Sequence, residues 1–352
     1  MPQSIRPYLE YQADRVEAVL AAHRAPGRIT GGTVGPRLIR FFLNPAPHIR
    51  FASVKRLADD LALAMRVPNL RIDRGREGIV LEFSNPNPRP VELLSLLAEA
   101  SPLPAATALL GLADTGVPLM ARLSAPEVAH ILISGTTGSG KSVLMRTLAG
   151  SLVLAHRPDV LKLICIDPKQ RAFTALAAAP HLVRPLITEP DETLEAFRSL
   201  IRTMEIRDQR RECMPRIVVL VDELADLVMT GGKPVTEALT RLVQRGREAG
   251  IHVVAATQRP SAAILSGLMR ANFPLRLVGR VVSANDARLA CGRGGTQAHL
   301  LEGRGDFLAV NGGDDPLRFQ VAYIDEQALE NEIKDVLAFG PPRATTRHRR
   351  TR

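Results

Sequence analysis

The sequence is poor in cysteine and contains no long hydrophobic run. Its 352 residues include three cysteines, Cys165, Cys213 and Cys291, which lie far apart and form no CxxC pair. This spacing indicates neither a disulfide framework nor a zinc site, and it favours a reduced, cytoplasmic setting. No apolar stretch approaches the roughly 18 residues that a membrane span requires. The N-terminal segment is charged and lacks a signal-peptide core, so we expect a chain without a membrane span.

Aromatic residues and lysine are scarce as well. Tryptophan is absent, aromatic residues make up 4% of the chain, and 40 of its 46 cationic side chains are arginines. The cations outnumber 36 acidic residues, and the resulting formal net charge of +10 favours a polyanionic partner. Hydrophobic residues at 45% and charged residues at 23% exclude wholesale disorder. A chain of this length is expected to form about two domains.

The apolar pattern divides the chain into four expected segments. Residues 1–33 are interpreted as a solvated helix and the start of a glycine-rich linker at 27–36, and residues 34–123 as a small α+β region. Over residues 124–340 short apolar runs alternate with helical stretches, which is typical of a mostly parallel sheet covered on both faces. Residues 341–352 form a basic tail. The expected strands of the third segment lie at 131–134, 161–166, 217–221, 251–255 and 275–281, with a hairpin at 307–310 and 319–323.

A phosphate-binding motif lies between the first of these strands and a helical stretch at 143–154. Residues 135–142 read GTTGSGKS, a full match to GxxxxGK[ST]. Lys141 is expected to reach the β- and γ-phosphates and Ser142 to bind Mg²⁺. A glycine-rich turn that only precedes a helix is the alternative, and the flanking strand and helix favour phosphate binding. The expected ATP contacts are Gly135, Thr136, Thr137, Gly138, Ser139, Gly140, Lys141 and Ser142.

Polar residues follow two further apolar strands. Asp222 and Glu223 come directly after the strand at 217–221, where Asp222 is expected to bind Mg²⁺ through water and Glu223 to activate the attacking water as a general base. A helix cap is the alternative interpretation of this acidic pair. Gln258 ends the next strand, where an amide can sense the γ-phosphate or serve a structural purpose.

Several longer motifs together resemble the FtsK/SpoIIIE family of double-stranded DNA translocases. The matching stretches are HILISGTTGSGKSV, ICIDPK, RIVVLVDELADLVM, RGREAGIHVVAATQRPS, ANFPLRLVGRVVSANDARL and GRGDFL, with GPRLIRFFLNPAP in the first half. The resemblance covers roughly residues 34 to 325. It implies an α/β fold with a RecA-like P-loop NTPase, in which helices flank a mostly parallel sheet, preceded by a small α+β subdomain.

The resemblance also implies partners and further site residues. A hexameric ring of this chain would surround duplex DNA with ATP at the subunit interfaces, and Arg247 matches the arginine finger that reaches a neighbour's site. The alternative is a solvated helix face, because Arg241 and Arg245 lie nearby. The low aromatic content agrees with duplex binding better than with stacking on single strands. The residues expected to contact the DNA backbone are Arg259, Arg270 and Arg288.

The sequence also departs from longer members of this family. We expect neither the N-terminal membrane helices nor the C-terminal winged-helix domain that those members carry. The DNA that is moved could therefore be a chromosome, a plasmid or a mobile element. A related ring ATPase that moves protein in a secretion system is the alternative function. A non-motor DNA-binding protein with a decayed site is a third reading, and the complete set of Lys141, Ser142, Asp222 and Glu223 argues against it.

Overall fold

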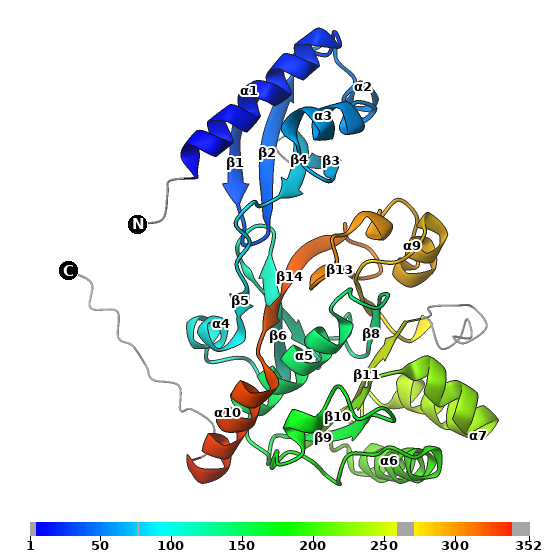
Figure 1. Ribbon diagram of the computed structural model, residues 1–352. Coiled ribbons are helices and arrows are strands. Elements are labelled where there is room, and N and C mark those ends of the chain that lie inside the picture. Colours follow the sequence, from blue (N-terminus) through cyan, green and yellow to red (C-terminus); the bar gives the residue numbers. More distant parts are fainter. Residues whose placement is uncertain (1–4, 76–77, 259–270, 340–352) are drawn as a thin grey trace. The chain divides into compact units, whose positions relative to one another are not determined.

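The structure is a computed structural model that describes residues 5–75, 78–258 and 271–339 (Figure 1). The chain forms two compact units, one made of Met1–Pro90 with Asp114–Gly116 and the other of Val91–Ala113 with Val117–Arg352. This division differs from the expected boundary between residues 123 and 124. The reason is that the hairpin formed by β6 (Thr107–Ala113) and β7 (Pro118–Arg122) pairs through β6 with β14 (Leu317–Tyr323) in the large sheet.

The first unit is an antiparallel sheet with helices packed on one face. Its strands lie in the order β1-β2-β4-β3, and its core holds Phe41, Leu81 and Phe83 from the sheet with Val16 and Leu20 from the first helix. The elements are α1 (Arg6–Ala22), β1 (Gly27–Val34), β2 (Leu38–Pro45), α2 (Phe51–Lys55), α3 (Ala58–Met65), β3 (Leu70–Gly75) and β4 (Gly78–Ser84).

The linker expected at residues 27–36 is wrong, because this stretch contains strand β1. Its residues pair with β2 in antiparallel register, for example Gly32 with Phe41. A Cβ atom on Gly32 would lie 2.3 Å from the carbonyl oxygen of Arg40. At this position glycine therefore permits a close approach of two backbones, where the sequence pattern had suggested flexibility.

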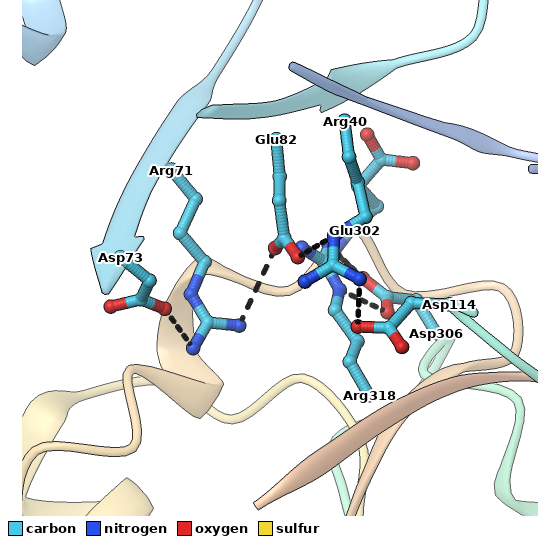
Figure 2. A network of polar contacts seen from close by, with 8 residues as sticks. All are labelled: Arg40, Arg71, Asp73, Glu82, Asp114, Glu302, Asp306 and Arg318. Carbon is cyan, nitrogen blue, oxygen red and sulfur yellow. Dashed lines mark hydrogen bonds and ion pairs between the residues drawn. The ribbon is translucent and has the colours of Figure 1, made fainter. Parts of the chain in front are cut away.

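The opposite face of this sheet carries a ladder of ion pairs (Figure 2). Arg40 and Arg71 are the cross-strand neighbours of Glu82 on either side, and their guanidinium nitrogens lie 3.1 and 3.8 Å from its carboxylate. Arg71 also pairs with Asp73 at 2.6 Å, and Arg40 with Asp114 at 3.2 Å. The buried charge of Glu82 is thus compensated on both sides, as a buried carboxylate requires.

The second unit is built on one long sheet in the order β7-β6-β14-β13-β12-β8-β11-β10-β9. The segment from β12 to β9 is parallel, and the segment from β13 to β7 is antiparallel. Its other elements are β5 (Val91–Glu92), α4 (Leu93–Ala100), β8 (Ile131–Ser134), α5 (Lys141–Ala155), β9 (Leu161–Ile166), α6 (Pro190–Arg210), β10 (Arg216–Val221), α7 (Leu224–Arg245), β11 (Ile251–Thr257), β12 (Leu275–Val278), α9 (Ala284–Cys291), β13 (Asp306–Val310) and α10 (Glu326–Phe339), with 3₁₀ turns at Thr174–Leu176 and Ala298–Leu300.

Alternate residues of the parallel strands face two separate cores. In β10, Val218 and Leu220 belong to the core that also contains side chains of α4, α5 and α10, whereas Val219 and Val221 belong to the core that contains side chains of α6 and α7. Burial on both faces explains the continuous apolar runs in the sequence. The expected fold class and central strands are confirmed, although the last of the parallel strands ends at Val278 instead of residue 281. No helix within the described part of the chain is long and apolar enough to cross a membrane.

Candidate nucleotide site

The parallel strands of the second unit bring the predicted site residues to one edge of the sheet. Because β8, β9, β10 and β11 run in the same direction, their carboxyl ends meet there. The GTTGSGKS segment connects the end of β8 to the start of α5, which begins at Lys141. The first N–H groups of a helix have no intrahelical partner, so the amides at this helix start are available to an anion.

Hydrogen bonds and left-handed glycines set the conformation of the loop. Thr136 donates from both its backbone nitrogen and its hydroxyl group to the carbonyl oxygen of Arg280, at 2.9 and 3.0 Å. Ser139 is buried, and its backbone N–H donates to the carbonyl oxygen of Thr136 at 3.1 Å. Gly138 and Gly140 have φ values of +80° and +100°, which a side chain would disfavour.

Lys141 and Glu223 meet at the start of α5. Both side chains are buried, and Lys141 Nζ lies 3.8 Å from Glu223 Oε2. The backbone N–H of Gln258 donates to both carboxylate oxygens of Glu223, at 3.1 and 3.3 Å. The side-chain oxygen of Gln258 accepts a hydrogen bond from the Thr137 hydroxyl at 3.2 Å. The structure thus places the predicted base and the predicted sensor beside the loop.

Asp222 has the surroundings of a group that needs a cation nearby. It directly follows β10, it is buried, and its Oδ1 has no hydrogen-bond partner among the described residues. Burial raises the pKa of this carboxyl group, Lys141 opposes that shift, and Asp167 and Glu223 add to it. An orphaned buried carboxylate oxygen fits a water molecule of a hydrated Mg²⁺ ion.

The remaining ligands of a Mg²⁺ ion would not be acidic side chains. Within the described residues no group of three or more histidine, cysteine, aspartate and glutamate side chains could hold a metal ion. Mg²⁺ favours oxygen ligands and retains several waters, so the Ser142 hydroxyl and the phosphates of a nucleotide would complete the set. The residues present therefore fit Mg²⁺ bound together with a nucleotide.

Asp167 is a site residue that the sequence analysis missed. It follows β9, and because Ile166 pairs with Val221 it lies opposite Asp222 at the same edge. Its Oδ2 accepts backbone hydrogen bonds from residues 171–173, at 2.8, 2.8 and 3.2 Å, while its buried Oδ1 has no partner in the part of the chain that the structure describes. The sequence contains a pattern that predicts this position, because Asp167 follows an apolar strand as Asp222 does.

Arg247 is not brought to the nucleotide site of its own chain. It lies between α7 and the first residue of β11, whereas Gln258 follows the last residue of that strand. Seven strand residues separate these two ends by roughly 20 Å. Arg247 is 42% exposed and has Glu248 at 3.6 Å, whereas Arg245 pairs with Asp208 of α6 at 2.8 Å.

The predicted DNA-contacting residues are only partly described. Arg288 lies on α9, and its exposed guanidinium donates to Asn285 Oδ1 at 3.3 Å. Arg259 and Arg270 lie outside the described residues.

The fold and site together define the class and the family of the chain. A parallel sheet with a GxxxxGKS loop between a strand and a helix, and with an acidic pair after a neighbouring strand, defines a P-loop NTPase. The chain belongs to the FtsK/SpoIIIE family. The model of that family matches residues 102–210 and 206–262, and the model of the FtsK alpha domain matches residues 3–85.

Curated relatives and solved structures agree with this assignment. The chain is 31% identical to "DNA translocase FtsK" of Listeria monocytogenes, with 94% of this chain and 47% of the relative covered. It is 33% identical to "DNA translocase FtsK" of Staphylococcus aureus, with 88% and 43% covered, so the chain spans less than half the length of these relatives.

Two solved structures show the same fold. One is the pCW3 conjugation coupling protein TcpA with ATPγS, with a TM-score of 0.64, 21% identity and coverage of 93% of this chain and 99% of that chain. The other is the cytoplasmic domain of the type VII secretion ATPase EccC of Thermomonospora curvata, with a TM-score of 0.62, 24% identity and coverage of 72% and 35%.

Proposed function

We propose that the chain binds ATP with Mg²⁺ and hydrolyses it. The observation that carries this proposal is the meeting of Lys141, Asp222 and Glu223 at one edge of the parallel sheet. The solved TcpA structure contains the ATP analogue ATPγS, which supports the same ligand class for this chain. Mg²⁺ would neutralise charge on the phosphates when bound.

In this proposal each side chain has a separate task. Lys141 contacts the terminal phosphates, where its ammonium group stabilises the charge that develops during transfer. Glu223 accepts the proton of the attacking water, and the backbone N–H of Gln258 holds the carboxylate in place for that purpose. The Gln258 side chain, which is linked to Thr137 of the loop, responds to the γ-phosphate.

We further propose that hydrolysis moves double-stranded DNA. The curated relatives are named DNA translocases, and the net charge of +10 suits a polyanionic partner. Arg259, Arg270 and Arg288 would contact phosphates without reading bases. The low cysteine content favours a cytoplasmic setting for this work.

The position of Arg247 supports a ring of subunits, which we propose is hexameric. Arg247 precedes β11, whereas the nucleotide site of its own chain lies at the other end of that strand, so a role in hydrolysis would be at a neighbouring site. Arg245 has an acidic partner on α6, whereas the ion pair of Arg247 is with its sequence neighbour Glu248. An arginine supplied from a neighbour would complete the charge stabilisation when subunits close.

The deciding experiment compares ATP hydrolysis with no DNA, with duplex DNA and with single-stranded DNA. We expect duplex DNA to raise the rate and single-stranded DNA to raise it less, with Lys141→Ala as the inactive control. Secretion ATPases such as EccC share the fold, so a protein-moving ring is the second candidate. A rate that does not respond to duplex DNA would exclude the DNA motor and leave that candidate.

A further inference from the structure

The GRGD turn, residues 303–306, packs against the back of the phosphate loop. The backbone N–H of Arg304 donates to the carbonyl oxygen of Gly138 at 2.9 Å. The backbone N–H of Gly305 donates to the carbonyl oxygen of Ser139 at 2.8 Å. Two successive amides of the turn therefore hold two successive carbonyl groups of the loop, across more than 160 residues of sequence.

These two hydrogen bonds fix the direction of loop amides. In a trans peptide the C=O and N–H groups point to opposite sides. Because the Ser139 carbonyl points to Gly305, the N–H of Gly140 points away from the turn, toward the concave side of the loop. Because these donors are already oriented in the free loop, phosphate binding costs less conformational entropy than it would in a mobile loop.

The contact is so close that only glycines allow it. A Cβ atom on Gly140 would lie 2.5 Å from the backbone nitrogen of Gly305, and one on Gly303 would lie 3.0 Å from the carbonyl oxygen of Gly138. Gly303, Arg304 and Gly305 have φ values of +78°, +52° and +91°. The two glycines adopt this conformation without penalty, whereas Arg304 between them is disfavoured in it and is held by neighbouring structure.

A buried ion pair provides that support. Asp306 Oδ1 accepts from Arg318 Nε at 2.9 Å, and Oδ2 accepts from Arg318 Nη2 at 2.7 Å and from the backbone N–H of Glu302 at 2.8 Å (Figure 2). Both side chains are only about 5% exposed. Such a bidentate pair is rigid, and it ties both ends of the turn to strands β13 and β14.

Strand β14 also holds the turn through backbone oxygens. The backbone N–H of Val321 donates to the carbonyl oxygen of Gly305 at 2.8 Å. The side-chain amide of Gln320 donates to the carbonyl oxygen of Arg304 at 3.2 Å. The two inner residues of the turn thus donate to the phosphate loop and accept from β14.

We propose that the GRGD turn is a clamp that keeps the phosphate loop in its nucleotide-binding conformation, with Asp306 and Arg318 as positioning residues. This inference rests on the proposed ATP binding. If the loop adopts the binding conformation only part of the time, the apparent dissociation constant rises by the inverse of that fraction. Loosening the clamp therefore weakens nucleotide binding without removing any group that touches the nucleotide.

The test measures the dissociation constant for ATPγS in folded parent and variant proteins. Gly305→Ala would place a Cβ atom 2.6 Å from the Gln320 side-chain nitrogen at a left-handed φ. We expect it to weaken ATPγS binding by about tenfold or more. Gly312→Ala, in the turn at the other end of the β13–β14 hairpin, has no described atom within 4 Å of the new Cβ and should bind as the parent does. Asp306→Asn removes the positioning charge and is the second variant if Gly305→Ala does not fold.

Hydrogen exchange of the turn provides a readout that general destabilisation would not move. Coupling between the clamp and the loop is reciprocal, so ATPγS should slow exchange of the Arg304 and Gly305 amides in the parent. Parent affinity for Gly305→Ala and Asp306→Asn, or exchange unaffected by ATPγS, would overturn the clamp. If the parent itself fails to bind ATPγS, the proposed nucleotide function fails instead.

Discussion

His130 and His252 predict an acid-labile second unit, because each is held in one neutral tautomer. The backbone N–H of Val253 donates to His130 Nδ1 at 2.9 Å, so this nitrogen cannot carry a proton. Arg216 Nη1 lies 3.2 Å from His252 Nε2, and a guanidinium can only donate, so the proton of His252 lies on Nδ1 and faces the Ala129 carbonyl oxygen at 3.0 Å. Protonation would break the first contact and put a second cation beside Arg216.

The magnitude follows from the shifted pKa values. Burial lowers the pKa of His130 to about 3 and that of His252 to about 4, from an ordinary 6.5. Below pH 6.5 the unfolded chain therefore binds protons that the folded chain excludes, and stability falls as the pH falls. Between pH 7.5 and pH 5 this costs about 2 kcal/mol for each histidine, or about 4 kcal/mol for the pair. Burial also lowers the pKa of His156 and His181, which adds a loss of the same sign.

Urea unfolding at pH 7.5 and pH 5 measures this loss. The matched protein is the double variant His130→Asn and His252→Asn, in which amide oxygen and amide nitrogen can replace the acceptor and donor Nδ1 atoms. It should be less stable than the parent at pH 7.5 but should lose about 4 kcal/mol less on acidification. The other titrating groups are common to both proteins and cancel in the comparison. An equal loss in parent and double variant would refute the reasoning.

Three further predictions concern the proposed motor activity. Glu223→Gln should still bind ATPγS but lose turnover by about 10²- to 10⁴-fold, because an amide cannot accept the proton; hydrolysis at the parental rate would exclude Glu223 as the base. Arg247→Ala should bind nucleotide normally and hydrolyse it more slowly, by ~10³-fold or more. Mixing it with Lys141→Ala chains should partly restore hydrolysis, since some interfaces then join an intact arginine to an intact site. No recovery on mixing would exclude action on a neighbour. Duplex binding measured over a range of salt should show log K falling by about 0.9 per phosphate neutralised for each unit of log salt, and a flat response would contradict backbone contacts.

The sequence by itself determined the fold class and the centre of the site, because these depend on short local patterns. The buried strands at 131–134 and 217–221 are continuous apolar runs, and both are strands in the structure. A polar residue that follows such a strand must lie at the carboxyl edge of a parallel sheet, so Asp222 could be placed near Lys141 from the order of residues alone.

The same rule did not resolve how the side chains are held. Besides the side chain that was expected to act, the backbone N–H of Gln258 contacts Glu223, and no pattern in the sequence indicated this contact. Asp167 obeys the rule as Asp222 does, but its orphaned oxygen appears only when β9 and β10 are aligned. The register between strands decides which polar groups come into contact, and the sequence of one strand alone does not determine that register.

Tertiary structure alone decided what the glycines do and where Arg247 lies. The glycines of β1 and of the GRGD turn look alike in sequence, since glycine suits both a mobile linker and a close approach of two backbones. Only the partner segment distinguishes the two cases: the Arg40 carbonyl oxygen lies close to Gly32, and the Gly305 backbone nitrogen lies close to Gly140. Arg247 is near Gln258 in the sequence, but a straight strand separates them. Contacts between segments that are distant in the sequence form only when the sheet assembles, so a local sequence pattern does not predict them.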